Sequence, residues 1–409
     1  DNGMILIMLY LLMYFVISRF YIYKSYVFNA FLVAGCVISL LAVLHFFYID
    51  PIGVMEGNTE YTILNFGTTI GNKNTIASYM CIFLPVAIMM FVVQNSTTVR
   101  ILSAVSVCCA WWGLLVASSY SGYLGFFVVL FCMLLFCVRR AQLLRRLMFA
   151  LTIMFASTIL LRLFSFIMDD KSKGFEAIGE MILYNYYIYI VAAVCALLTG
   201  ILYLLKKNPN IIEKWPKNIL TIIVVAAGVS VVIVCGYLFY KYTFVDTKTD
   251  IGGWSHIFRF DDRWGTHRGF MWINGLKDYA DSGFINILFG SGCDTFYHVF
   301  EPHFAELSAR FHNSSTNCIH SEYLNYLITQ GLFGLLSYLT IIVSVLVRVI
   351  RKWKDNKLVL LFIFPIIAYC AQASVNIYTP VVTPFLFIFV ALCECIARDS
   401  NPYFNKLSY

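Results

Sequence analysis

The chain has 409 residues, of which 60% are hydrophobic and 12% are charged, and its formal net charge is +7. Water-soluble domains carry about 25% charged residues. This composition therefore excludes a soluble protein and makes lipid the solvent for much of the surface. Aromatic residues account for 17% of the chain, which suits a protein with two membrane interfaces to anchor.

Long apolar runs predict the fold class. A helix that crosses a bilayer needs about 20 mostly apolar residues, so we expect an all-α integral membrane protein with about eleven transmembrane helices. In chain order, the runs are 4–20, 26–48, 76–93, 99–117, 123–138, 147–168, 182–205, 219–240, 322–347, 358–378 and 384–396.

Lysine and arginine gather in three connections, which parity places on one face. The positive-inside rule makes that face cytoplasmic. Asp1 then lies outside and the tail after Arg398 inside, so one further helix before Asp1 is expected, giving twelve in the full-length protein. The basic residues are Arg139, Arg140, Arg145 and Arg146; Lys206, Lys207, Lys214 and Lys217; and Arg348, Arg351, Lys352, Lys354 and Lys357.

The connection after the eighth run is far longer than ordinary loops, and it lies outside. It mixes aromatic and charged residues, as functional loops do. We therefore expect one integrated membrane domain with an N-terminal bundle at 1–240, a large extracytoplasmic loop at 241–319 and C-terminal helices at 320–409. The apolar spacing at 270–279 and 296–307 predicts short amphipathic helices within the loop.

Two outer segments could bind a ligand. Asn72 and Asn74 open the third run, where they act either as helix caps or as a polar cavity rim that binds sugar hydroxyls. In the long loop, Arg268 and Trp272 share a helix face and follow Arg263. Arginine matches phosphate geometry, so this face is either a phosphate and sugar site or an interfacial amphipathic helix.

Three ionisable residues near the outer face are further candidates. His320 lies where the loop re-enters the membrane and is either a general base or a polar residue at a helix start. Glu322 is two residues further on. Arg162 lies about two turns inside the sixth run, where it either serves a site or extends its side chain to the headgroups.

The sequence shows no convincing metal site. Asp261 and Asp262 could hold a divalent cation, but solvation of a loop explains the pair more simply, and no Cys/His grouping has zinc-ligand spacing. Cys293 and Cys318 lie in the polar loop, where spacing alone decides neither for nor against a disulfide.

Four elements in order resemble the O-antigen ligase and polymerase family of membrane glycosyltransferases. The segment at 65–77 contains GNKN and resembles its G-N-x-N-x-x-A element, and Arg268 to Trp272 resembles its R-x-x-x-W element. The LFGSGCDTF run at 288–296 is similar to its L-x-G-x-G-x-x-x-F turn. HSEYL at 320–324, followed by QGLFGLL at 330–336, is similar to the family's last element.

The resemblance implies a metal-independent enzyme of the GT-C type without a cofactor, located in the bacterial cytoplasmic membrane with its active site outside. The donor would be a glycan on undecaprenyl diphosphate and the acceptor a carbohydrate or lipid-linked hydroxyl, as in O-antigen, lipopolysaccharide, capsule or exopolysaccharide synthesis. Arg268, with Arg263 or Arg162, would bind the diphosphate, and His320 would act as the base. Asn72, Asn74, Trp272 and Glu322 would line the glycan cavity.

Two positions depart from the family pattern. The serine-arginine-glycine that the family often has at an outer helix end is Ser121-Gly122 here, without the arginine, and the asparagine after the histidine is Ser321. Two other functions remain open from the residues: a membrane transporter, and a non-catalytic partner of other polysaccharide assembly proteins. Nucleic acid is not an expected partner.

Overall fold

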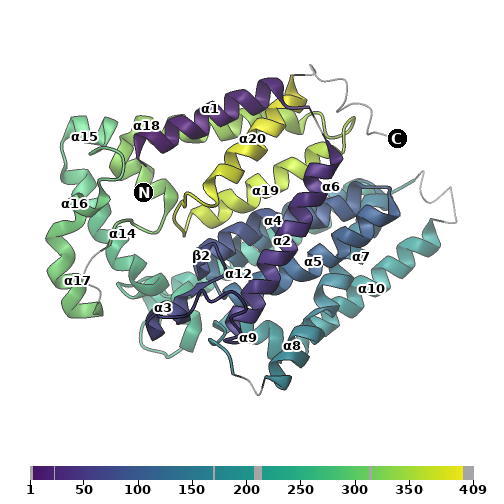
Figure 1. Cartoon of the computed structure of the whole chain (residues 1–409), viewed down its shortest axis with the longest axis horizontal. Coiled ribbons are helices and arrows are strands. Elements are labelled where there is room, and N and C mark those ends of the chain that lie inside the picture. Colours follow the sequence, from purple (N-terminus) through teal and green to yellow (C-terminus); the bar gives the residue numbers. More distant parts are fainter. Residues whose placement is uncertain (1–2, 23, 169–170, 207–213, 313–315, 399–409) are drawn as a thin grey trace.

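The computed structural model describes residues 3–22, 24–168, 171–206, 214–312 and 316–398, which are mostly helical (Figure 1). The helices are α1 Met4–Phe20, α2 Ser25–Phe46, α3 Glu60–Asn65, α4 Lys73–Val93, α5 Thr97–Ala117, α6 Tyr120–Cys137, α7 Ala141–Ala156, α8 Thr158–Ile167, α9 Ala177–Tyr184, α10 Tyr187–Leu205, α12 Lys217–Tyr240, α13 Ser255–Phe258, α14 Trp264–Asp281, α15 Phe284–Phe289, α16 Phe296–Phe300, α17 Phe304–Phe311, α18 Glu322–Ile350, α19 Leu358–Ala373 and α20 Thr383–Ala397. Single π or 3₁₀ turns occupy Lys241–Val245, Gly252–Trp254 and Glu301–His303. The strands β1 Phe66–Gly67 and β2 Gly71–Asn72 pair antiparallel.

Each apolar run that the sequence predicts contains an apolar helix in the structure. Among the described residues, eight helical segments are long and apolar enough to cross a membrane, and α1, α19 and α20 are shorter apolar helices. The fold is therefore that of an all-α, multi-pass membrane protein.

Two predicted runs are interrupted, one of them at 182–205, where Asn185 and Tyr186 separate α9 from α10. The run at 147–168 divides into α7 and α8 at Ser157. There the Ser157 hydroxyl donates to the carbonyl of Met154, and the Trp112 indole donates to the Ser157 carbonyl at 3.1 Å. These side-chain hydrogen bonds compete with the regular helix ladder, which explains the break.

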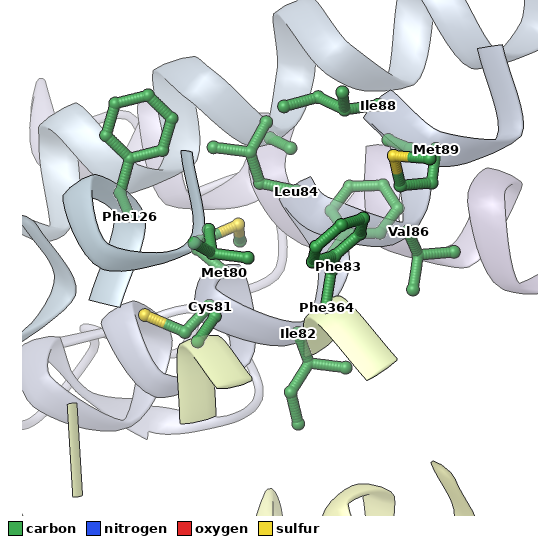
Figure 2. Packing of buried hydrophobic residues seen from close by; sticks show 14 of the residues in the cluster. Met80, Cys81, Ile82, Phe83, Leu84, Val86, Ile88, Met89, Phe126 and Phe364 are labelled. Carbon is green, nitrogen blue, oxygen red and sulfur yellow. The ribbon is translucent and has the colours of Figure 1, made fainter. Parts of the chain in front are cut away.

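Helix α4 is the centre of the bundle. Every residue from Thr75 to Val92 is buried, and a helix that is apolar all round belongs in an interior. Figure 2 shows its side chains pointing in several directions, with Phe126 of α6 and Phe364 of α19 beside them. Helices α5, α6, α7 and α19 surround α4, so its first turn is held in a fixed position.

The outer helices are exposed and apolar. No residue of α12 is buried, and Val232 is 72% exposed. On α10, Leu197 and Leu204 are exposed in the same way. Such a surface is unfavourable in water and favourable against lipid tails. The exposed faces of these helices therefore mark the lipid-facing rim of the bundle.

The three basic connections meet at one end of the bundle. A guanidinium NH2 group of Arg140 donates to the carbonyl of Lys354 at 2.8 Å, and the Trp215 indole donates to the carbonyl of Val138 at 2.7 Å. Lys207 lies outside the described residues. The parity of the predicted helices is thus consistent with the structure.

The long connection between α12 and α18 has a small core of its own. Buried residues of α14, α16, α17, the segment before α18 and the start of α18 form it: Phe270, Met271, Phe296, Phe300, Leu307, Ile319 and Ile328. Figure 1 shows α14 to α17 grouped at one end of the bundle, next to α18. The amphipathic helices predicted here are present, except that a 3₁₀ turn containing Pro302 separates α16 from α17.

Candidate functional site

Arg268 and His320 come together where α14 meets the segment before α18. Burial lowers the pKa of Arg268 to about 10. Burial, and then the charge of Arg268, lower the pKa of His320 to about 3. Within the described part of the chain, no carboxylate pairs with the Arg268 guanidinium. A desolvated cation without a counter-charge favours an anionic ligand.

The His320 imidazole is neutral and partly unsatisfied. Its Nδ1 atom is buried without a hydrogen-bond partner among the described residues. A neutral ring can accept a proton, and a hydroxyl placed against it would satisfy this atom. The backbone of His320 is in the left-handed region at φ 54°, which a non-glycine residue rarely adopts.

A second left-handed segment precedes Arg268. Gly265, Thr266 and His267 have φ values of 58°, 64° and 69°, and the regular part of α14 begins only after them. Thr266 and His267 each hold this conformation at a cost of about 1–2 kcal/mol. Strain of this kind concentrates at functional sites.

Trp272 connects the two halves of the site. Its indole N–H donates to the carbonyl of Ile319 at 2.9 Å, and its ring packs edge-on against Trp264 with centroids 5.0 Å apart. Trp272 and Arg268 therefore face the same segment, as their spacing predicts. Trp272 supports the residue before His320 with its polar atom, and its ring is partly exposed.

Two glycine elements of the sequence meet in the structure. Gly331 has a non-helical backbone conformation inside α18, with φ 69° and ψ −175°, so the helix is kinked there. The freed carbonyl of Thr329 accepts the N–H of Gly292 at 2.8 Å. A Cβ at Gly290 would collide with the backbone of Thr329, and one at Gly331 with that of Leu288. Only glycine allows this close contact, which fixes the loop against the first turns of α18.

Asn72 and Asn74 start α4 at the same end of the bundle. The Asn72 side chain accepts the N–H of Asn74 at 2.8 Å, so Asn72 is a helix cap. The Asn74 side chain accepts from the Ser119 hydroxyl at 2.7 Å. The capping interpretation of Asn72 is confirmed, and Asn74 joins α4 to the start of α6.

A buried polar cluster continues from Asn74. The amide of Asn376 donates to Ser78 and Ser121 at 3.1 Å each, and to Gln372 at 3.0 Å. The cluster therefore lies at Ser121, where the family arginine is missing. Sequence reasoning missed Gln372 and Asn376, although two amides four residues apart at the end of an apolar run were a usable signal.

The segment after Asn376 approaches the Arg268 and His320 cluster. The Tyr378 hydroxyl accepts from the Asn325 amide at 3.1 Å. Burial raises the pKa of Tyr378, with further contributions from Asp294 and Cys318. Tyr378 is thus within electrostatic range of Cys318, two residues before His320. Residues 376–378 connect the start of α4 to the candidate site.

Glu322 does not lie on a cavity rim. Its side chain is fully buried and accepts hydrogen bonds from the hydroxyls of Tyr338 at 2.7 Å and Tyr369 at 2.9 Å. The two tyrosines come from α18 and α19, so the carboxylate fastens the start of α18 to α19. Glu322 therefore holds in place the start of α18, two residues after His320, and is not placed to contact a ligand.

The other predicted arginines lie apart from Arg268 or more exposed than it. Arg162 is exposed on α8, which contacts α7 and α9 and lies away from α14 in Figure 1. Arg263 is exposed just before the strained turn, and its main-chain N–H donates to Asp261 at 2.8 Å. The structure therefore brings Arg268 and His320 together, places Arg263 nearby, and leaves Arg162 elsewhere.

The sequence offers Asp261 and Asp262 as candidate metal ligands, and Cys293 and Cys318 as a candidate disulfide. Among the described residues, no group of three or more His, Cys, Asp or Glu side chains is placed to hold a metal ion. Asp262 instead pairs with Arg310 at 2.5 Å. Cys293 and Cys318 are both free thiols.

No curated protein matches the chain. Residues 177–339 match the family model described as O-antigen ligase, and they include Arg268, His320 and Gly331 but not the start of α4. The match covers less than half of the chain and shows that this part is similar to the O-antigen ligase family. Together with the apolar helices, it supports a multi-pass membrane protein with glycosyltransferase-like activity in polysaccharide assembly.

Proposed function

We propose that the protein transfers a glycan from an undecaprenyl-diphosphate donor to a sugar hydroxyl, as an O-antigen, capsule or exopolysaccharide polymerase or ligase. The single observation that carries this proposal is the desolvated Arg268 guanidinium, unpaired among the described residues and next to a neutral His320. Glycosyl transfer from a lipid diphosphate needs an anion site beside a proton acceptor, and these two residues supply that pair.

The reaction exchanges one bond for another. The acceptor oxygen forms a bond to the anomeric carbon while the bond from that carbon to the diphosphate oxygen breaks. Arg268 offsets the charge that grows on the leaving diphosphate. The acceptor proton passes to His320. The products are a new glycosidic linkage and undecaprenyl diphosphate, and no step needs a metal or cofactor.

Donor binding would also adjust the base. Free His320, with its pKa lowered to about 3, is a weak proton acceptor. An anionic diphosphate on Arg268 adds negative charge next to the ring, which favours its protonated form. The imidazole therefore becomes a better base only when the donor is bound. This coupling would limit wasteful proton transfer in the empty site.

The positive-inside rule supports an outward site in the cytoplasmic membrane. The basic connections occupy one end of the bundle, where Arg140 contacts Lys354. Arg146 of the same basic end bonds the carbonyl of Val92 at the far end of α4. Asn72 and Asn74 lie at the near end of α4 and connect to the candidate site through residues 376–378. A cytoplasmic basic end thus makes the site extracytoplasmic.

Purified protein in liposomes tests the proposal directly. Labelled undecaprenyl-diphosphate glycan and an unlabelled acceptor glycan should yield a labelled, longer product, with the same rate in the presence of EDTA. Movement of intact donor across the bilayer without a new linkage would indicate a transporter. Absence of both, in protein that binds its assembly partners, would indicate a non-catalytic role.

A further inference from the structure

A cavity of about 430 Å³ lies at the basic end of the bundle, far from the candidate site. It is formed where α7 begins and α10 ends, and the indole of Trp215 closes one side. Four cationic side chains line it, and none of its lining residues is acidic: Arg139, Arg140, Arg145 and Lys206.

The cations differ in what they already contact. Arg140 is held by the Lys354 carbonyl and lies over the Trp353 ring at 5.2 Å. Arg145 lies over the ring of Tyr203 at 5.8 Å. Arg139 and Lys206 are exposed, and neither forms an ion pair with a carboxylate of the described residues. The cavity therefore has positive charge that no described side chain neutralises.

The surroundings resemble those of a lipid headgroup. Leu202 and Leu205 contribute apolar walls, and the adjacent surface of α10 exposes Tyr203 by 59% and Leu204 by 65%. The first turn of α7 has no side-chain cap, so its N–H groups also favour an anion. A ligand with a phosphate and long acyl chains matches both the charge and the apolar flank.

We propose that this cavity binds the phosphate headgroup of an anionic membrane lipid. Basic pockets between membrane helices on the cytoplasmic side bind such headgroups. Orientation in the membrane requires only that lysine and arginine occur in these connections. The positive-inside rule does not require the basic residues to surround one cavity. Arg351 and Lys217 lie in the same basic connections and do not line the cavity.

Spin-labelled lipids measure how strongly the protein prefers an anionic lipid headgroup to a zwitterionic one. The intact protein is reconstituted in phosphatidylcholine vesicles with a trace of spin-labelled phosphatidylglycerol or phosphatidylcholine, and the motionally restricted fraction is compared. Arg139→Gln with Lys206→Gln should reduce the preference for phosphatidylglycerol about 25-fold, since each of the two cations near a membrane surface contributes on the order of fivefold. The control, Arg351→Gln with Lys217→Gln, removes the same charge and should keep the preference.

A second variant leaves every cation in place. Gln142 also lines the cavity and is exposed, so Gln142→Glu should lower the preference in protein that has its full set of basic residues. An equal loss in the test and control pairs, or an unchanged preference in both cavity variants, would overturn the proposal. Displacement of the labelled lipid by inorganic phosphate alone would also overturn it, because the site would then be one for a soluble anion.

Discussion

Trp272 and Ile319 tie the helix that carries Arg268 to the segment that carries His320. The indole N–H of Trp272 donates to the Ile319 carbonyl at 2.9 Å. The bond joins residues 47 positions apart, so it sets the relative position of two groups that the chain itself does not hold together. Loss of this bond should therefore affect the geometry of the site more than the fold.

Trp272→Phe keeps an aromatic ring against Trp264 and removes the donor. A hydrogen bond of this kind contributes about 0.5–1.5 kcal/mol, so we expect glycan transfer to fall up to about tenfold, with a small decrease in the unfolding temperature. Trp254→Phe is the control, because Trp254 stacks on Phe258 in the same loop. Equal activity of the two variants would show that the bond does not position His320.

Gly331→Ala should prevent the loop from packing against α18. The new Cβ would meet the backbone of Leu288, and a non-glycine residue at φ 69° costs about 1–2 kcal/mol before any collision. We expect the unfolding temperature in detergent to fall clearly, as measured by fluorescence-detected gel filtration of heated samples. Gly200→Ala is the matched control, since a Cβ there has no neighbour within 4 Å. It should be neutral or slightly stabilising.

Tyr369→Phe removes one of the two donors to the buried Glu322 carboxylate. An acceptor that loses a buried partner costs about 1–3 kcal/mol, so the unfolding temperature should fall. Tyr237→Phe, on the exposed face of α12, should leave the unfolding temperature unchanged. A Tyr369→Phe protein as stable as the control would indicate that the carboxylate does not fasten α18 to α19.

His320 should make the folded protein sensitive to acid. Burial, then the Arg268 charge, lower the pKa of His320 to about 3, while the unfolded chain binds this proton near pH 6.5. This contribution to stability is complete above pH 6.5 and declines as the pH falls toward 3, by at most about 1.4 kcal/mol per pH unit. His320→Gln should therefore lose less stability between pH 7.5 and 5 than the wild type. His298→Gln, at an exposed position, should follow the wild type.

Sequence reasoning located the helices well. A spanning segment needs a long apolar run, so the length of each run predicts a helix almost directly. The break at Ser157 could not be predicted, because it depends on the indole of Trp112, 45 residues earlier. The burial of Glu322 likewise depends on Tyr338, 16 residues further along α18, and on Tyr369, 47 residues away on α19.

The site was predictable in its residues but not in its geometry. The shared helix face of Arg268 and Trp272 follows from their spacing of four, whereas the proximity of Arg268 to His320 rests on the resemblance to the family. No local pattern predicts the left-handed turn at Gly265 to His267. The His267 ring of that turn stacks on Phe311 with centroids 4.3 Å apart, a contact between segments that are distant in the chain.

Donor binding measured separately from transfer tests the central claim most directly. Arg268→Gln should weaken binding of undecaprenyl diphosphate by about 10- to 100-fold, since a charged hydrogen bond contributes about 1.5–3 kcal/mol. His320→Gln should bind the donor nearly as well as the wild type and lose transfer by about 10²–10⁴-fold, while Arg263→Gln should retain most of both activities. Wild-type binding and transfer by Arg268→Gln, in folded protein, would contradict the account.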